Sequence, residues 1–224
     1  MKYFLIVASC LFSLNAVAQN NPYGLDIIDT RQGYKAVIAA DSNNRLVEIK
    51  KYIPNIQLDI RYATANNFTH QAVYNQARAF ARLPVVRALQ KIQAELNKQG
   101  LGLKIFDAYR PYAITVKFYE IANDKDFVAN PKNGSRHNRG CAVDLSLIDL
   151  KTGRELEMPT PYDSFAPEAS PNFAGLSPAV QKNRDLLRMT MERHGFTVIN
   201  NEWWHYDFND WKKYQLMDIS FKQL

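Results

Sequence analysis

The stretch that decides the fold lies near the C-terminus and reads Asn-Glu-Trp-Trp-His-Tyr-Asp-Phe, residues 201–208. Asn200 and Asn201 are typical of a turn, and the residues after Glu202 alternate as a β-strand requires. Alternation predicts two faces, which carry Trp204, Tyr206 and Phe208 on one side and Trp203, His205 and Asp207 on the other. Because Glu202 stands where the turn enters the strand, its side chain can swing toward the side of His205.

A second strand is predicted from Cys141 onward. Its alternation puts a set of apolar side chains on one face, namely Cys141, Val143, Leu145 and Leu147. The other face carries Asp144 and Ser146 and is expected to face outward, as in a half-buried strand. His137 precedes Asp144 by seven residues, and the intervening Gly140 allows a turn that folds His137 back over Asp144. Two histidines, an aspartate and a glutamate are therefore expected to converge between neighbouring strands.

Such a convergence has a specific chemical use. His137, Asp144 and His205 can occupy three positions of a tetrahedral Zn²⁺ and leave the fourth open for water. Zinc lowers the pKa of water from about 15.7 toward about 7, and Glu202 can take the proton that this water loses. The pattern therefore predicts metal-assisted hydrolysis.

The rest of the chain predicts an α+β mixture and not a repeated βαβ unit. Each helix is marked by a proline or helical apolar spacing, and several elements end at a glycine or an asparagine turn. Helices are predicted from Pro84 to Gly100, over 111–122 and over 179–194; strands are predicted over 56–62, 103–106 and 196–199, besides the two above. Residues 46–224 are expected to form one domain, and residues 19–45 an N-terminal extension.

The first 18 residues have the form of a signal peptide. Lys2 is followed by an apolar run from Tyr3 to Leu14, and Ala16-Val17-Ala18 is a cleavage site for a signal peptidase. We therefore expect an exported protein, periplasmic or secreted, without stable membrane insertion after cleavage. Lipidation at Cys10 is the alternative, although the apolar run continues past that residue. Cleavage leaves Cys141 as the only cysteine, so no intramolecular disulfide is expected.

Composition excludes several other classes of function. The formal charge is +6, but the 28 Lys and Arg residues are spread along the chain, so nucleic-acid binding is not expected. The sequence lacks the Gly-x-Ser-x-Gly and Ser-x-x-Lys motifs of serine hydrolases. A thiol mechanism through Cys141 is disfavoured because burial on the apolar strand face would raise its pKa.

Four ordered motifs between Gln57 and Phe208 resemble those of the zinc D-alanyl-D-alanine dipeptidases, a family that includes the vancomycin-resistance dipeptidases. They are Arg61-Tyr62-Ala63-Thr64 with Asn67-Phe68, Asp107-Ala108-Tyr109-Arg110-Pro111, Ser135-Arg136-His137-Asn138-Arg139-Gly140-Cys141-Ala142-Val143-Asp144, and Glu202-Trp203-Trp204-His205. The resemblance implies a central, mainly antiparallel sheet flanked by helices, as in zinc D-Ala-D-Ala carboxypeptidases and the amino-terminal domain of Hedgehog proteins.

The resemblance also implies a role for each site residue and a small D,D-dipeptide as substrate. His137, Asp144 and His205 would hold one Zn²⁺ per chain. Glu202 would be the general base and then the general acid, and Arg110 would steady the oxyanion. The substrate pocket would be lined by Ser135, Tyr62 and Asp163, with Asp163 meeting the substrate ammonium.

The sequence leaves some alternative interpretations open. Asp163 is also consistent with a simple turn residue, and Arg110 with a salt bridge at the start of a helix. The alternatives to a dipeptidase are a zinc carboxypeptidase acting on longer peptidoglycan peptides and a non-catalytic Hedgehog-like zinc module. An intact Glu202 and Arg110 disfavour the module, because a structural zinc needs neither residue. The sequence does not specify an oligomeric state.

Overall fold

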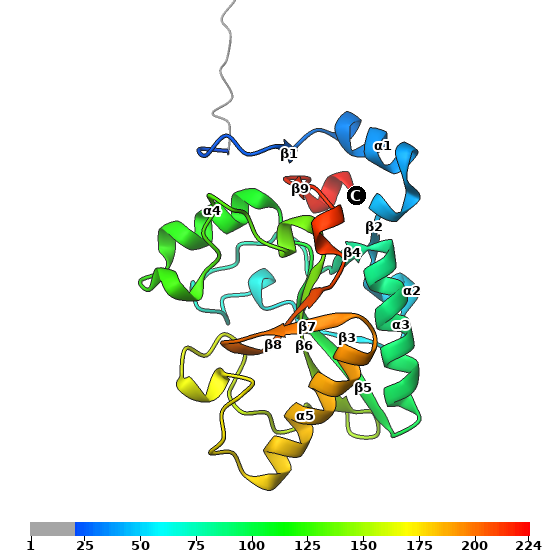
Figure 1. Ribbon diagram of the computed structural model, residues 1–224, viewed down its shortest axis with the longest axis vertical. Helices are drawn as coiled ribbons and strands as arrows, with labels where there is room; N and C mark the ends of the chain where they lie inside the picture. The colour runs from blue at the N-terminus through cyan, green and yellow to red at the C-terminus, as the bar shows by residue number, and fades with distance from the viewer. Residues whose placement is uncertain (1–20) are drawn as a thin grey trace, which may run out of the picture.

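The computed structural model describes residues 21–224, and the predicted signal peptide over 1–18 lies outside the described residues. Within 21–224 the α-helices are α1 (Arg31–Ala40), α2 (Ile49–Tyr52), α3 (Leu83–Asn97), α4 (Tyr112–Ile121) and α5 (Pro178–Arg193) (Figure 1). The strands are β1 (Ile27–Ile28), β2 (Leu46–Glu48), β3 (Gln57–Leu58), β4 (Phe80–Arg82), β5 (Leu101–Asp107), β6 (Ala142–Asp149), β7 (Phe196–Ile199), β8 (Glu202–Phe208) and β9 (Leu216–Met217). No helix of this described region is long and apolar enough to cross a membrane.

A five-stranded sheet forms the centre of the molecule, in the order β3-β5-β6-β8-β7. The β3 and β5 strands are parallel, and the other three pairings are antiparallel. In Figure 1, α4 and α5 lie on opposite sides of β8. The α+β class with a mainly antiparallel central sheet is therefore confirmed.

The helix α3 shows why the apolar pattern determines this packing. Its residues at helical spacing are all fully buried, namely Val85, Val86, Leu89, Ile92 and Leu96. Pro84 stands in the first turn, and Gly100 adopts a φ of 72° just beyond the last turn, a conformation that favours glycine. An interaction of 2.8 Å between Glu95 and His194 holds α3 beside the end of α5.

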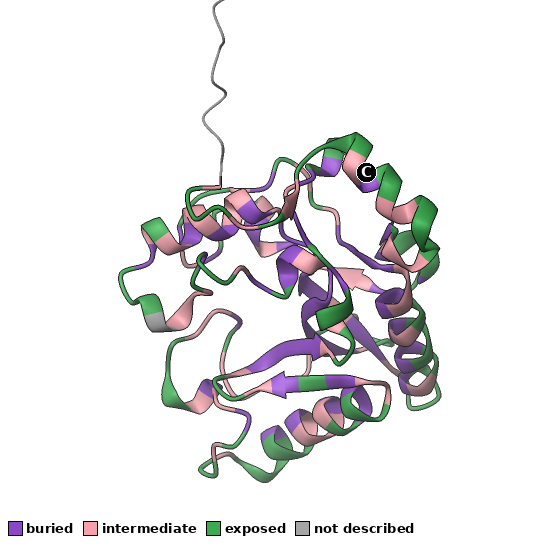
Figure 2. Cartoon of the chain, turned by 45° about the horizontal axis from the view of Figure 1, so that its top comes forward, coloured by how far each residue is buried: buried purple, intermediate pink, exposed green. Residues whose placement is uncertain are grey.

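The strand β6 is buried along almost its whole length, which Figure 2 shows as purple strands in the middle of the chain. The predicted apolar face, with Val143 and Leu145, belongs to the hydrophobic core. The opposite face was expected to be exposed, but Asp144 and Ser146 are only 3% and 0% exposed. This face is buried because the segment after β6 folds back over it: Tyr162 donates a hydrogen bond to Asp144.

One sequence expectation at the edge of the domain needs correction. The strand expected over 56–62 is limited to Gln57–Leu58, and a 3₁₀ turn over Arg61–Ala63 follows it. The turn is fixed because the Tyr62 carbonyl accepts hydrogen bonds from the amides of Val73 and Tyr74, both at 2.8 Å. The described part of the expected extension, 21–45, contains α1, and β1 pairs with β9 near the C-terminus.

The strand β8 departs from strict alternation at its start. Val198 pairs with Tyr206, but the next residue, Ile199, pairs with Glu202, so the register shifts between them. Trp203 and Trp204 are consequently both buried, and Trp204 shares a cavity with His205 instead of lying on the face of Tyr206. The predicted face of Trp204 was therefore wrong, because the extra residues form a bulge that local alternation does not reveal.

Candidate active site

Three side chains from two segments meet at the centre of the sheet. His137 lies in the 3₁₀ turn His137–Arg139, which Gly140 ends with a φ of 69° before β6 begins. A Cβ at Gly140 would come within 2.5 Å of the Leu46 side chain, so the turn requires glycine. The chain thereby folds back as predicted, and His137 Nε2 lies 3.4 Å from Asp144 Oδ1.

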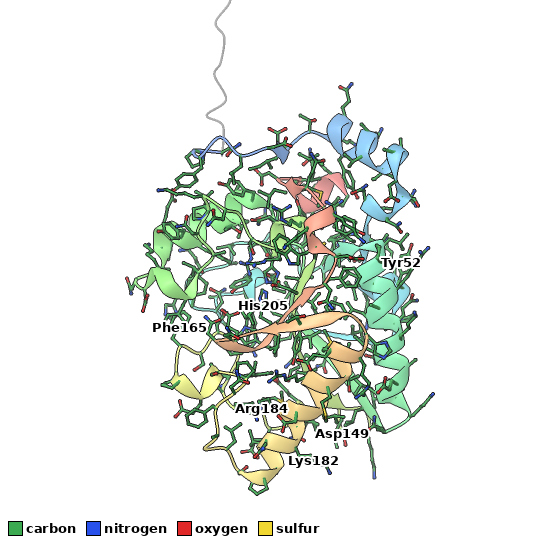
Figure 3. The ribbon with its side chains drawn as sticks, in the orientation of Figure 1. Tyr52, Asp149, Phe165, Lys182, Arg184 and His205 are labelled. Atoms are coloured by element: carbon green, nitrogen blue, oxygen red, sulfur yellow. The ribbon has the colours of Figure 1, made fainter. Side chains whose placement is uncertain are left out.

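His205 joins them from the neighbouring strand, because it stands opposite Asp144 in the β6–β8 register. Its Nδ1 atom is 3.1 Å from Asp144 Oδ1 and 3.2 Å from His137 Nε2. Figure 3 places His205 on one side of β8 and Arg184 of α5 on the other. Three potential metal-ligand atoms are therefore clustered in the described chain, all within 4.8 Å of one another.

One ring nitrogen of each histidine is hydrogen-bonded outside the cluster, and this determines which ring nitrogen faces the cluster. His137 Nδ1 donates to the Ala108 carbonyl at 2.7 Å, and His205 Nε2 donates to Asp207 Oδ1 at 3.0 Å. Each ring therefore directs its other nitrogen, with a free lone pair in the neutral form, toward Asp144 Oδ1. That carboxylate oxygen is buried and has no hydrogen-bond partner. The donor set and its outer partners fit a bound metal ion.

Electrostatics in the metal-free cluster follow from one carboxylate between two imidazoles. Burial raises the pKa of Asp144, but His137 and His205 outweigh it and hold that pKa far below its ordinary value. Burial alone would lower the pKa of His205, but Asp144 and Asp207 outweigh burial and raise that pKa to about 10. In the absence of metal, His205 therefore keeps a proton beside the ionised Asp144, in the place that a bound cation would take.

Glu202 stands beside this cluster. Its Oε2 lies 3.6 Å from His205 Nδ1, and its side chain is 19% exposed. Burial raises the pKa of Glu202, and the negative charge of Asp144 adds to that effect, while His205 opposes it. A carboxyl group with a raised pKa next to a water-accessible cavity is suited to accept and return a proton.

Arg110 approaches the cluster from the segment between β5 and α4. Its Nε and Nη2 both donate to Asp107 Oδ2, at 3.0 and 2.7 Å, and Nη2 lies 4.0 Å from Asp144 Oδ2. Tyr74 donates to the other oxygen of Asp107 at 2.9 Å. The guanidinium carbon lies 4.7 Å from the Phe118 ring centre. Arg110 is thus a buried cation held rigidly by Asp107. Arg110 forms this salt bridge and also lines the cavity.

The three residues expected at the substrate lie in the same cavity. Tyr62 donates to Asp163 Oδ1 at 3.0 Å, while Asp163 Oδ2 is buried without a hydrogen-bond partner. Burial and the charge of Asp144 raise the pKa of Asp163 to about 8. Asp163 has a φ of 62°, a left-handed conformation that aspartate tolerates better than most residues. Ser135 accepts a hydrogen bond from the His137 amide at 3.2 Å.

All eight predicted site residues line one cavity of about 230 Å³. Sequence reasoning assigned no role to the rest of its lining, which contains five aromatic side chains from loops, from α4 and from β8. These further residues include Phe68, Phe118, Phe127, Phe165 and Trp204. It also missed Asp207 as the partner of His205, although alternation placed both on one face, and it missed Arg136 at the cavity. Phe165 is labelled in Figure 3, where it lies at the edge of the molecule.

The fold and this cavity define a class of protein: an α+β protein in which three residues that could hold a metal ion lie at the central sheet beside a glutamate and an arginine. The family follows from comparison with known sequences. A family model described as D-ala-D-ala dipeptidase matches residues 42–222. The chain therefore belongs to the D-ala-D-ala dipeptidase family of peptidases, and the resemblance found in its motifs is confirmed.

Relatives within this family cover most of the chain. It is 34% identical over 176 residues to the D-alanyl-D-alanine dipeptidase of Escherichia coli (strain K12), which covers 79% of this chain and 91% of that protein. The D-alanyl-D-alanine dipeptidase of Enterococcus faecium is 31% identical over 186 residues, 72% of this chain and 90% of that protein. A solved structure of a vancomycin-resistance D,D-dipeptidase with a D-Ala-D-Ala phosphinate analogue has a TM-score of 0.37 and 22% identity, over 58% of this chain and 51% of that chain. The family assignment rests on the sequence matches alone.

Proposed function

We propose that the protein is a zinc-dependent dipeptidase that hydrolyses D-alanyl-D-alanine. The observation that carries the proposal is the cluster of His137, Asp144 and His205, whose ligand atoms face one another beside Glu202 in a small cavity. The names of the relatives support the substrate, since those proteins are D-alanyl-D-alanine dipeptidases.

The same three residues would hold zinc. Bound there, zinc would act as a Lewis acid and make water a nucleophile near neutral pH. Glu202 then accepts the proton of the attacking water and later donates it to the amine that leaves. Its raised pKa suits both steps, because a base that is too weakly basic cannot take the proton and a group that is too strongly basic cannot return it.

Arg110 would hydrogen-bond the oxygen of the scissile carbonyl as negative charge develops on it. Two of its nitrogens are engaged by Asp107, which fixes the plane of the guanidinium and leaves Nη1 available. Because the donor is already in place, little reorganisation is needed when the charge forms.

The substrate amino end would lie at Asp163. Its unpartnered Oδ2 is buried at the cavity, and a buried carboxylate is stabilised by an ammonium group that donates to it. Tyr62 orients the other oxygen, and Ser135 lines the cavity beside His137. These contacts favour a peptide with a free amino group over a longer peptidoglycan chain.

The direct experiment measures D-alanine release from D-Ala-D-Ala by the purified protein, before and after chelation and after zinc is restored. We expect activity that is lost on chelation and returns with zinc, at one zinc per chain. L-Ala-L-Ala and a cell-wall pentapeptide ending in D-Ala-D-Ala serve as comparison substrates. Faster hydrolysis of the pentapeptide would replace the dipeptidase by a carboxypeptidase, and full activity without metal would remove zinc from the mechanism.

Export remains part of the proposal and rests on residues 1–18, which have the composition of a cleavable signal. Sequencing the N-terminus of the mature protein tests it. We expect a chain that begins at Gln19, whereas a lipid-modified Cys10 would show the alternative route.

A further inference from the structure

Arg136 stands immediately before the metal-ligand candidate His137 and lines the cavity. Among the described residues of the lining, two carry a permanent positive charge, Arg110 and Arg136. They differ in their surroundings. Arg110 is buried and bonded to Asp107, whereas the side chain of Arg136 is 48% exposed. The second arginine is therefore accessible to a ligand that enters from solvent.

The guanidinium of Arg136 is held on two sides. Its Nε lies 3.4 Å from Asp207 Oδ2, and its central carbon lies 4.8 Å from the centre of the Trp211 ring. Asp207 is itself fixed, because its other oxygen accepts from His205 Nε2. Neither contact uses the terminal nitrogens of Arg136, and these donate to no acceptor among the side chains that the structure describes. An arginine fork is thus oriented in advance with free donors.

We infer that Arg136 binds the C-terminal carboxylate of the peptide substrate, a role that rests on the proposed dipeptidase function. A D,D-dipeptide is a zwitterion, and its two charged ends flank the scissile bond. Asp163 provides a buried acidic oxygen for the ammonium end. Arg136 adjoins the metal cluster in sequence and carries the charge and the planar fork that a carboxylate accepts in a bidentate manner.

This assignment specifies the substrate class. The residue that leaves must carry a free carboxylate directly after the scissile bond, so the enzyme removes a C-terminal residue and does not cut within a chain. An amide at the same position keeps the size of the substrate but loses the negative charge. Recognition by Arg136 therefore discriminates D-Ala-D-Ala from D-Ala-D-alaninamide.

A purely structural role is the rival explanation. Arg136 contacts Asp207, which supports His205, so its loss could disturb the metal cluster instead of the substrate. The two roles differ in their readouts. A disturbed cluster lowers zinc content and lowers kcat for both substrates, whereas a lost carboxylate contact raises KM for the acid and leaves the amide unchanged.

The experiment compares wild type with Arg136→Ala, Arg136→Lys and Lys212→Ala on D-Ala-D-Ala and on D-Ala-D-alaninamide. Lys212 is the matched control, because its Nζ lies 5.7 Å from the centre of the same Trp211 ring but the residue is exposed outside the cavity. Zinc content is measured in every variant.

For Arg136→Ala we expect full zinc content, a rise in KM for D-Ala-D-Ala of roughly 10- to 100-fold, and no more than about a twofold change in kcat/KM for the amide. Arg136→Lys should recover part of the loss, and Lys212→Ala should behave as wild type. An unchanged KM in Arg136→Ala, or an equal loss on acid and amide, overturns the inference while the dipeptidase function stands. A zinc-loaded wild type without activity on D-Ala-D-Ala overturns both.

Discussion

Glu202 and His205 lie on the same side of β8, with Glu202 Oε2 at 3.6 Å from His205 Nδ1, although a regular strand would direct residues three apart to opposite faces. The pairing of β7 with β8 shifts register between Val198 and Ile199, and the resulting bulge brings Glu202 to the side of His205. The proposed general base is thereby brought beside a proposed metal ligand from the same short segment. The tryptophans between them are both buried and anchor the bulge from within the core.

The first prediction concerns Glu202. Glu202→Gln keeps the size of the side chain but cannot accept a proton, so we expect kcat for D-Ala-D-Ala to fall by about 10²- to 10⁴-fold. Zinc content should remain near one per chain, because Glu202 is not among the three clustered ligand atoms. Steady-state kinetics together with metal analysis test this. A folded, zinc-loaded variant with near-normal kcat would show that another group moves the proton.

The second prediction concerns Asp207, which orients His205 through the 3.0 Å contact to Nε2. Asp207→Asn retains an acceptor oxygen but removes the charge, so we expect zinc affinity to fall by roughly 10- to 100-fold. Competition with a zinc chelator of known affinity measures the change. Asp210→Asn, an exposed aspartate three residues further on, is the control and should leave affinity unchanged. Equal affinities in Asp207→Asn and wild type would remove Asp207 from the support of the metal.

Much of the site could be predicted because its chemistry depends on local patterns. The turn at Gly140 and the period of β6 were enough to bring His137 over Asp144, and helical spacing gave α3, α4 and α5 to within about a residue at most ends. The resemblance to the family then assigned distant residues such as Tyr62 and Asp163 to the substrate pocket, and both line the cavity.

The features that were missed depend on tertiary contacts. The strand expected over 56–62 ends at Leu58, because the Tyr62 carbonyl pairs with a later loop and not with β5. Asp144 is covered by the segment around Tyr162, which shows no regular period of its own. Alternation along β8 does not reveal its bulge, because residues are extra only in relation to the partner strand.

The third prediction concerns pH and Asp163. Its pKa is raised to about 8 in the fold, mainly by burial, against about 3.9 in an unfolded chain. The folded state therefore binds the proton more readily between these values, and its free energy of unfolding falls as pH rises from about 4 to about 8. In the metal-free protein, wild type should lose more stability between pH 5 and pH 8 than Asp163→Asn, by at most about 4 kcal/mol.

Chemical denaturation of the metal-free proteins at the two pH values provides the measurement. Asparagine is the suitable replacement because it tolerates the left-handed backbone of residue 163 and keeps an oxygen for the Tyr62 hydroxyl. If both proteins lose the same stability between pH 5 and pH 8, Asp163 is ionised in the fold and the burial of its carboxyl does not control the titration.

The last prediction concerns Arg110, whose fixed charge lies 4.0 Å from Asp144 Oδ2 and is oriented by Asp107. An interaction that is stronger in the transition state than in the bound substrate lowers kcat when it is removed. Loss of one oxyanion donor costs roughly 2.7 to 4 kcal/mol, so Arg110→Ala should lower kcat by about 10²- to 10³-fold. Arg110→Lys should recover only part, because lysine keeps the charge but cannot reach Asp107 and the substrate oxygen with one planar fork.

Folding must be checked in the same experiment, since Arg110→Ala leaves Asp107 buried without its cation. Tyr74→Phe is the control for this effect, because it removes a hydrogen bond to Asp107 and leaves the guanidinium in place. We expect Tyr74→Phe to lower stability with little change in kcat, and Arg110→Ala to lower both. If Arg110→Ala, folded and loaded with zinc, raises KM and leaves kcat intact, Arg110 binds the ground state of the substrate and another donor stabilises the oxyanion.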